Sequence, residues 1–310
     1  MAYEEAAHLH AIAPLETLSL VFMVLCTLAF IVGVTGNGVI IFITSCQKKK
    51  TVDAMWHMNM AIAGFIFSIF LPLMVAQVAL GLHWYLRSAK TLSNTVTCLH
   101  MFSSAFLLTA LSVDRCILVA RPEWAWNHRT PLLAFRIVMG IWALSVGFSL
   151  RYGDLWESLL SPASTGTNVP FDEWRVQAAV QIQFLVGFLI PLALILIPTF
   201  YIVVAAKLRG NRLIQSTKPL KILCGLIPTF FLCWLPYHVF SFLLISPKYP
   251  LPFLVTESNF ACVLSYFNSC LNPVFYLTME EEFLKYWQRL CSRNYLGQFS
   301  GPSLESMNLS

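Results

Sequence analysis

Charged residues are unevenly spaced along this chain, and long uncharged stretches separate them. Six stretches contain no Asp, Glu, Lys or Arg between their charged ends: 16–48, 53–87, 90–114, 175–207, 221–248 and 257–280. A seventh, 130–150, is apolar except for Arg136, which lies near one end and can extend its guanidinium to a membrane interface. Each stretch meets the length of about 20 apolar residues that a helix needs to cross a bilayer. The pattern predicts seven transmembrane helices.

Composition supports the same interpretation. The chain has 310 residues, of which 57% are hydrophobic and only 11% are charged. Soluble domains carry roughly a quarter charged residues, so a soluble fold of this size would lack the polar surface it needs. The net charge of +5 is modest, and no feature of the sequence indicates nucleic-acid binding. The apolar residues are therefore expected to face lipid.

The distribution of Lys and Arg predicts the orientation in the membrane. One set of loops holds 15 of the 20 Lys and Arg residues, and the opposite set holds five: Arg87, Lys90, Arg151, Arg175 and Lys248. Basic loops stay in the cytoplasm, which places the N-terminus outside the cell. We expect a multi-pass plasma-membrane protein with a short extracellular N-terminus (1–16), a membrane domain (17–279) and a cytoplasmic segment (280–310).

Four short motifs lie on four different predicted helices. They are Gly36-Asn37-Gly38-Val39, Asp114-Arg115-Cys116, Phe231-Leu232-Cys233-Trp234-Leu235-Pro236-Tyr237, and Asn268-Ser269-Cys270-Leu271-Asn272-Pro273-Val274-Phe275-Tyr276. Within a membrane, Asn37 and Asn272 need hydrogen-bond partners on other helices. Pro236 and Pro273 remove backbone hydrogen bonds and kink their helices. An Asp-Arg pair at the membrane boundary can hold a closed state by ion pairing.

Taken together and in this order, the motifs resemble the rhodopsin-like G-protein-coupled receptors over the whole chain. The resemblance implies an all-α membrane protein, a seven-transmembrane helix bundle with a short amphipathic eighth helix. It also implies a cytoplasmic switch that couples to a heterotrimeric G protein, with its residues at Asp114, Arg115, Cys116, Asn272, Pro273 and Tyr276, and an interhelical polar contact at Asn37. Any one motif alone is equally compatible with ordinary helix packing or interfacial anchoring.

A narrower resemblance concerns the stretch from Asp114 to Thr130, which contains Arg121-Pro122-Glu123-Trp124-Ala125-Trp126-Asn127-His128-Arg129-Thr130. It is similar to the second intracellular loop of chemoattractant receptors, notably the formyl peptide receptors and the chemoattractant-type prostaglandin D receptor. That subgroup implies a peptide or lipid ligand, an inhibitory G protein and a role in chemotaxis and inflammation. Cys291 follows the last span and is a candidate for palmitoylation, although an unmodified cysteine is equally compatible with the sequence.

Three positions depart from the family pattern. Lys90 stands where the family has the cysteine that anchors the second extracellular loop, and that loop, 151–175, contains no cysteine. Gly64 replaces the usual Asp of a sodium site, which predicts weak or absent sodium sensitivity. Thr199 replaces a Tyr that engages the arginine of the Asp-Arg motif. These departures favour an alternative function, in which the chain is a decoy or degenerate receptor that binds ligand without activating a G protein.

The ligand pocket is expected between the outer halves of the helices. Candidate pocket residues are Gln183, Trp234, Tyr237 and His238, with bundle packing as the alternative role for each. Gln183 stands where the chemoattractant receptors carry a basic residue, and an amide pairs less well with an anion. The resemblance also argues against an amine ligand, because Thr97 is not an Asp, and against retinal, because Tyr266 is not a Lys. We expect no catalytic activity, metal or cofactor; the expected partners are an extracellular ligand, a heterotrimeric G protein and membrane lipids.

Overall fold

The computed structural model describes residues 2–47, 51–79, 87–160, 173–208, 218–246 and 251–279, and folds them into helices and short connections. The helices are α1 (Ala2–Cys46), α2 (Val52–Ala79), α3 (Arg87–Ala120), α4 (Pro122–His128), α5 (Pro131–Leu160), α6 (Glu173–Phe184), η1 (Leu185–Leu189), α7 (Ile190–Leu208), α8 (Lys218–Leu244) and α9 (Leu251–Met279). The short π-helical segment η1 joins α6 to α7. These three form one continuous span.

Six segments within the described residues are long and apolar enough to cross a bilayer: 20–46, 52–76, 91–120, 131–152, 174–205 and 223–243. The seventh predicted span corresponds to α9, whose 29 residues exceed the length of about 20 that a bilayer requires. This helix packs against α1, α2 and α8 within the bundle. The predicted seven-helix membrane fold is therefore confirmed.

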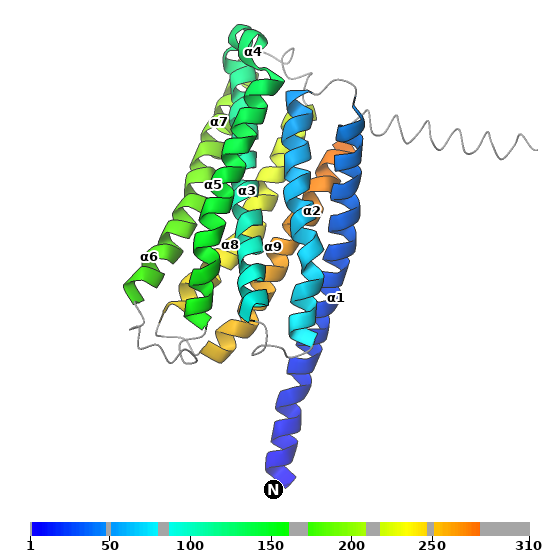
Figure 1. Ribbon diagram of the computed structural model, residues 1–310, viewed down its shortest axis with the longest axis vertical. Helices are drawn as coiled ribbons and strands as arrows, with labels where there is room; N and C mark the ends of the chain where they lie inside the picture. The colour runs from blue at the N-terminus through cyan, green and yellow to red at the C-terminus, as the bar shows by residue number, and fades with distance from the viewer. Residues whose placement is uncertain are drawn as a thin grey trace, which may run out of the picture.

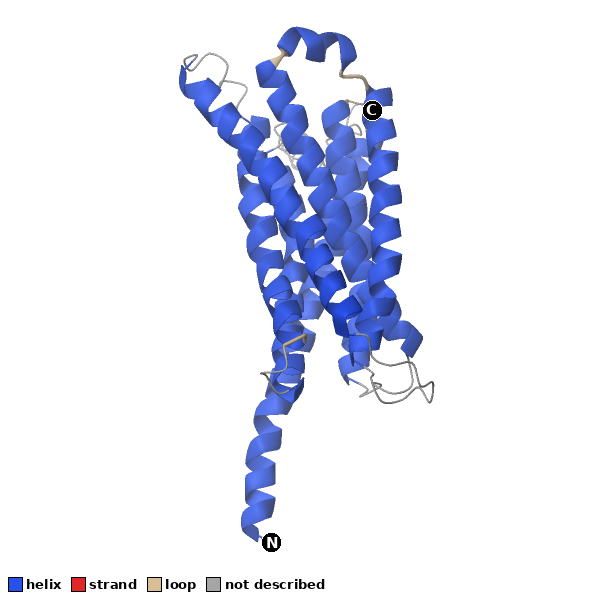
Figure 2. Ribbon diagram, turned by 90° about the vertical axis from the view of Figure 1, so that its left-hand side faces the viewer, coloured by secondary structure: helices blue, strands red, loops and turns tan. Residues whose placement is uncertain are grey.

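The long helices run side by side as a bundle, and α4 lies across one of its ends (Figure 1, Figure 2). At the opposite end α1 continues beyond the bundle (Figure 1), and this extension contains residues 2–16, which we assigned to the extracellular N-terminus. The middle of the bundle is organised by α3, which contacts α2, α5, α7 and α8. Motifs on α3 can therefore reach most of the other helices.

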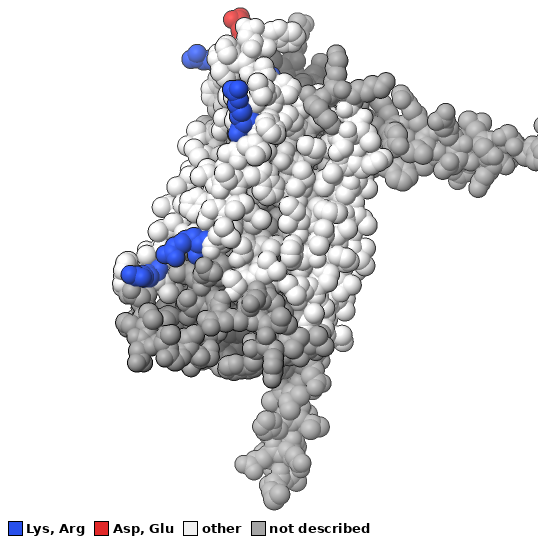
Figure 3. Space-filling model, viewed as in Figure 1, with Lys and Arg blue, Asp and Glu red and all other residues white. Residues whose placement is uncertain are grey.

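Large apolar side chains cover the outside of the bundle. Examples are Leu28 and Phe42 on α1, Leu132 and Phe135 on α5, and Ile197 and Phe200 on α7, all of them exposed. On the face drawn in Figure 3, Lys and Arg lie towards the two ends, and a band without charge separates them. This band has the character of a lipid-facing surface, because charged side chains are costly in hydrocarbon and gather at its borders.

Some predictions lie outside the described residues. The amphipathic eighth helix and tail, 280–310, are among them, as is the palmitoylation candidate Cys291. Residues 161–172 of the second extracellular loop also fall outside. Position 90, where the family cysteine is replaced by lysine, belongs to the first turn of α3.

Candidate functional site

The predicted Asp-Arg motif lies near the cytoplasmic end of α3, with Arg115 buried and Asp114 and Cys116 half-buried. Arg115 donates a hydrogen bond from Nη2 to Oδ1 of Asp53, at 2.7 Å. Asp53 is on α2 and lies 62 residues earlier in the chain. The arginine of the motif is therefore paired with another helix, and no ion pair joins Asp114 to Arg115, both of which the structure describes.

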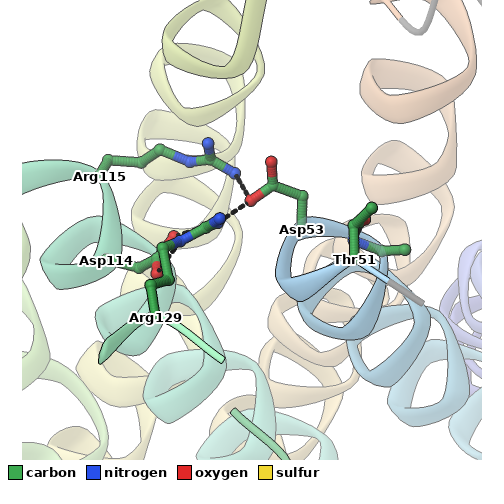
Figure 4. A network of polar contacts seen from close by, with 6 residues as sticks. Thr51, Asp53, Asp114, Arg115 and Arg129 are labelled. Carbon is green, nitrogen blue, oxygen red and sulfur yellow. Dashed lines mark hydrogen bonds and ion pairs between the residues drawn. The ribbon is translucent and has the colours of Figure 1, made fainter. Parts of the chain in front are cut away.

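Asp114 pairs instead with Arg129, in the link between α4 and α5. The Arg129 guanidinium donates from Nε to Oδ1 of Asp114 at 2.8 Å and from Nη2 to Oδ2 at 2.9 Å. This two-point geometry is the strong form of a carboxylate–guanidinium contact. The same Nη2 also donates to Oδ1 of Asp53. Two carboxylates and two guanidiniums thus form one chain of contacts across α2, α3 and the α4–α5 link (Figure 4).

Local sequence explains how these side chains are presented. Thr51 precedes α2, and its hydroxyl accepts a hydrogen bond from the backbone N–H of Ala54 at 3.1 Å, as an N-cap residue does. Asp53 then falls in the first turn of α2, where the helix dipole favours a negative charge. Pro122 begins α4 with a favourable first-turn residue. That short helix ends at His128 and leaves Arg129 in the link.

The four charges differ in their exposure to solvent. The side chain of Arg115 is 9% exposed and that of Asp114 is 10%, whereas Arg129 is 20% and Asp53 41%. Burial lowers the pKa of Arg129, but its hydrogen bond to Asp114 and the charges of Asp53 and Asp114 outweigh this effect and raise the pKa above its usual value. The Arg129 guanidinium is therefore fixed in its charged form.

A second polar contact joins α1 to α9. Pro273 has no N–H, so it leaves the carbonyl of Ser269, four residues earlier, without its helical donor. Asn37 supplies a replacement, because its Nδ2 donates to the Ser269 carbonyl at 2.9 Å and to the Gly33 carbonyl at 2.8 Å. The expected interhelical contact of Asn37 is thus present. The Ser269 carbonyl lies one turn before Asn272, which is buried.

Tyr276 lies closer to the cytoplasmic end of α9 and is 4% exposed. Its ring lies 4.6 Å, centroid to centroid, from that of His57 on α2. Since Asp53 occupies the preceding turn of α2, this helix contacts both Arg115 and the end of the Asn272–Tyr276 motif. No pattern in the sequence pointed to this role of α2.

The four predicted pocket residues come together in the outer half of the bundle. Gln183 on α6 donates from Nε2 to the hydroxyl of Tyr237 at 3.2 Å and to Sγ of Cys98 at 3.5 Å. Ring contacts join Tyr237 to Trp234 at 5.7 Å and to His238 at 5.5 Å between centroids. All four predicted residues are buried. The site is thus a contact between α3, α6 and α8, built from an amide, a phenol and aromatic rings.

One residue near this site was missed by sequence reasoning. His100 on α3 is 1% exposed, stacks on Phe67 at 4.5 Å, and lies 5.8 Å from the ring of Trp234. The available signal was a histidine inside the uncharged stretch 90–114. His100 therefore contacts Trp234, one of the four predicted pocket residues, through its ring.

Near this site, the arginines with described side chains are Arg151 and Arg175, and both lie towards its rim. The guanidinium of Arg175 lies 5.5 Å above the ring of Trp174, as a cation–π contact, and Arg151 is exposed at the outer end of α5. Among the described residues, no group of three or more His, Cys, Asp or Glu side chains gathers where a metal ion could bind. The interior of the site is therefore uncharged.

Replacing Gln183 by leucine is expected to lower the free energy of unfolding by about 0.5–2 kcal/mol, since it removes an interhelical hydrogen bond to Tyr237. The measurement is thermal unfolding of the purified protein in lipid nanodiscs. Gln181→Leu is the matched control, because Gln181 lies on the same helix but is exposed. Equal midpoints for the two variants would show that the Gln183 contact contributes nothing.

Comparison with known proteins decides the family. Residues 36–276 match the model of the seven-transmembrane receptors of the rhodopsin family. The chain belongs to that family. Chemerin-like receptor 1 of Homo sapiens is 35% identical over 324 residues, covering 95% of this chain and 85% of the relative. The same receptor of Mus musculus is 36% identical, covering 91% and 81%. N-formyl peptide receptor 3 of Homo sapiens is 31% identical over 277 residues, covering 82% and 77%.

These matches confirm the chemoattractant receptor group and the formyl peptide resemblance. The protein is a multi-pass plasma-membrane receptor of the G-protein-coupled class, and it is not an enzyme. The cytoplasmic site around Arg115 and the outer site around Gln183 stand at opposite ends of this receptor bundle. The roles of individual residues in these two sites are proposals.

Proposed function

We propose that this receptor binds a peptide or lipid chemoattractant at the Gln183–Tyr237 site and activates an inhibitory heterotrimeric G protein through Arg115. Support comes from the relatives, which are named chemerin-like receptor 1 and N-formyl peptide receptor 3. The single observation that carries the coupling step is Arg115, a buried arginine at the cytoplasmic end of α3 that is held by an ion pair to another helix. A ligand and a G protein that both favour the released state would raise each other's affinity.

The ligand site adds a constraint on ligand chemistry. The helices that form the ligand site carry hydroxyl, amide, thiol and aromatic groups but no Lys, Arg, Asp or Glu in the stretches 91–113, 176–205 and 223–243. A buried charge without a partner is strongly unfavourable. The part of the ligand that enters the bundle is therefore apolar or neutral, and any charged part contacts the rim near Arg175.

The test measures activation of inhibitory, stimulatory and other heterotrimers by the intact receptor in cells, with surface expression followed in parallel. The panel contains chemerin-derived peptides, formylated peptides, complement fragments and prostaglandins. Arg115→Ala is expected to lower activation by at least about tenfold, because a charge-assisted hydrogen bond contributes about 1.5–3 kcal/mol. Arg136→Ala is the matched control, since Arg136 is exposed on α5; an equal loss in both variants would contradict the assignment.

A decoy receptor is the second candidate, and Thr199 is the observation that favours it. Its hydroxyl donates to the carbonyl of Ile195 in its own helix at 2.7 Å, so it makes a local contact rather than one with α3. Ligand binding by a well-expressed receptor, without activation of any heterotrimer, would favour this function. Activation that disappears in Arg115→Ala would exclude it.

A further inference from the structure

The contacts of Arg115 show how the coupling residue is held. Its Nη2 donates to Asp53, but its Nε is buried and has no hydrogen-bond partner among the described residues. An unsatisfied buried donor is unfavourable. Asp53 thus maintains the orientation of Arg115 in this state, while the Nε–H of Arg115 lacks a partner. A partner that satisfied Arg115 more fully would compete with Asp53 for it.

Arg129 determines which carboxylate Arg115 can use. The two-point contact between Arg129 and Asp114 occupies both oxygens of the carboxylate that is adjacent to Arg115 in sequence. Arg115 is consequently directed to α2, where Asp53 also accepts from Arg129 (Figure 4). The cluster is neutral, with two positive and two negative groups. Loss of one carboxylate would leave two guanidiniums with a single counter-charge.

We propose that Asp53 and Arg129 are positioning residues that hold Arg115 in a resting orientation, and that a G protein couples by replacing Asp53 as the partner of Arg115. The proposal rests on the coupling role of Arg115 proposed above. Asp53 supplies the competing carboxylate, and Arg129 prevents Asp114 from taking that place. The second intracellular loop, through Arg129, thereby controls the energy needed to release Arg115.

The first experiment measures ligand-free nucleotide exchange by an inhibitory heterotrimer with the full-length receptor in lipid nanodiscs. Asp53→Asn is expected to raise basal exchange by about three- to tenfold, because a partly exposed ion pair is screened and contributes modestly. Asp53→Glu keeps the charge and is expected to stay near the wild-type rate. Glu123→Gln is the matched control, since it removes an exposed carboxylate on α4 outside the cluster.

Arg129 provides a sharper test of the arrangement. In an Arg129→Gln background Asp114 becomes available to Arg115, so adding Asp53→Asn is expected to change basal exchange by less than about twofold. Equal effects of Asp53→Asn with and without Arg129 would overturn the role of Arg129. Unchanged or lower exchange in Asp53→Asn, in a receptor whose wild type does catalyse exchange, would overturn the role of Asp53.

A second readout does not depend on the G protein. Thermal unfolding of wild type, Asp53→Asn, Arg115→Gln and the double variant forms a mutant cycle, and the shifts in midpoint are expected to be non-additive. Additive shifts would overturn the proposed hold on Arg115 whatever the exchange data show. A non-additive cycle with no exchange in any variant would instead refute the coupling function and, with it, the competition step.

Discussion

Replacement of Gly225 by alanine is expected to move the cytoplasmic half of α8 away from α9 and to raise ligand-independent activity. A Cβ at position 225 would lie 2.6 Å from Cδ1, 2.7 Å from Cε1 and 3.1 Å from Cγ of Phe275. These distances are too short for carbon atoms in contact, so the ring or the helix must move. Overpacking of this kind costs about 1–3 kcal/mol. Gly225 therefore permits a close approach of α8 to α9 in the resting bundle.

The sequence of α8 allows the helix to bend when a methyl group is added at position 225. Pro228 and Pro236 lie inside α8, and each weakens the backbone hydrogen bonding that would resist bending. A methyl group at 225 lies on the cytoplasmic side of both prolines and can displace that half of the helix. The displaced state is the one in which a G protein would reach Arg115.

Basal nucleotide exchange and the thermal unfolding midpoint of Gly225→Ala test this expectation together. Exchange should rise and the midpoint should fall. Gly140→Ala and Gly147→Ala are matched controls, since a Cβ at either position would meet no atom within 4 Å apart from the adjacent residues and backbone of its own helix. Alanine there should be neutral or stabilise the helix by about 0.5–1 kcal/mol. Adding Phe275→Ala removes the clash and should reverse the rise in exchange. If exchange stays high, contact between the new methyl group and the Phe275 ring is not the cause of the rise.

The membrane fold was predictable because each span is recognised from the length of its own uncharged stretch, without knowledge of the contacts between helices. Six charge gaps coincided with a membrane-length apolar helix, including the stretch that contains Arg136, and the seventh coincided with α9. Asn37 was expected to contact another helix, and the structure names the partner as the carbonyl freed by Pro273. Such a contact follows from the chemistry of the two residues once the fold is known.

The partners within the charged cluster could not be predicted in the same way. Sequence reasoning placed Asp114 with Arg115, whereas the structure pairs Arg115 with Asp53 and Asp114 with Arg129. Adjacent residues on a helix point in directions about 100° apart, so adjacency in sequence does not by itself determine the partner of a long side chain. Here Arg129 occupies both oxygens of Asp114. The actual pairs depend on how α2 and the α4–α5 link approach α3, which is a property of the whole bundle.

Replacing Gly64 by aspartate, which would return the family residue to the sodium position, is expected to destabilise this receptor. A Cβ at position 64 would lie 2.9 Å from both Nδ2 and Oδ1 of Asn37. The Asn37 amide is fixed there by its bonds to the Ser269 and Gly33 carbonyls. A carboxylate would displace this amide or lie against its oxygen. The cost is expected to be about 3 kcal/mol or more, since steric overlap and an unpaired buried charge add.

Thermal unfolding in nanodiscs separates these two contributions. Gly64→Ala introduces only the overlap, and Gly64→Asn adds a neutral side chain close in size to aspartate. The midpoints should therefore fall in the order alanine, asparagine, aspartate, with no difference between sodium and choline buffers for the wild type. A midpoint for Gly64→Asp that rises in sodium to the wild-type value would show that Asn37 can move aside and that an ion binds. Without that rise, Gly64 is a packing requirement of the α1–α2–α9 contact, and the loss of the acid cannot be reversed at this position alone.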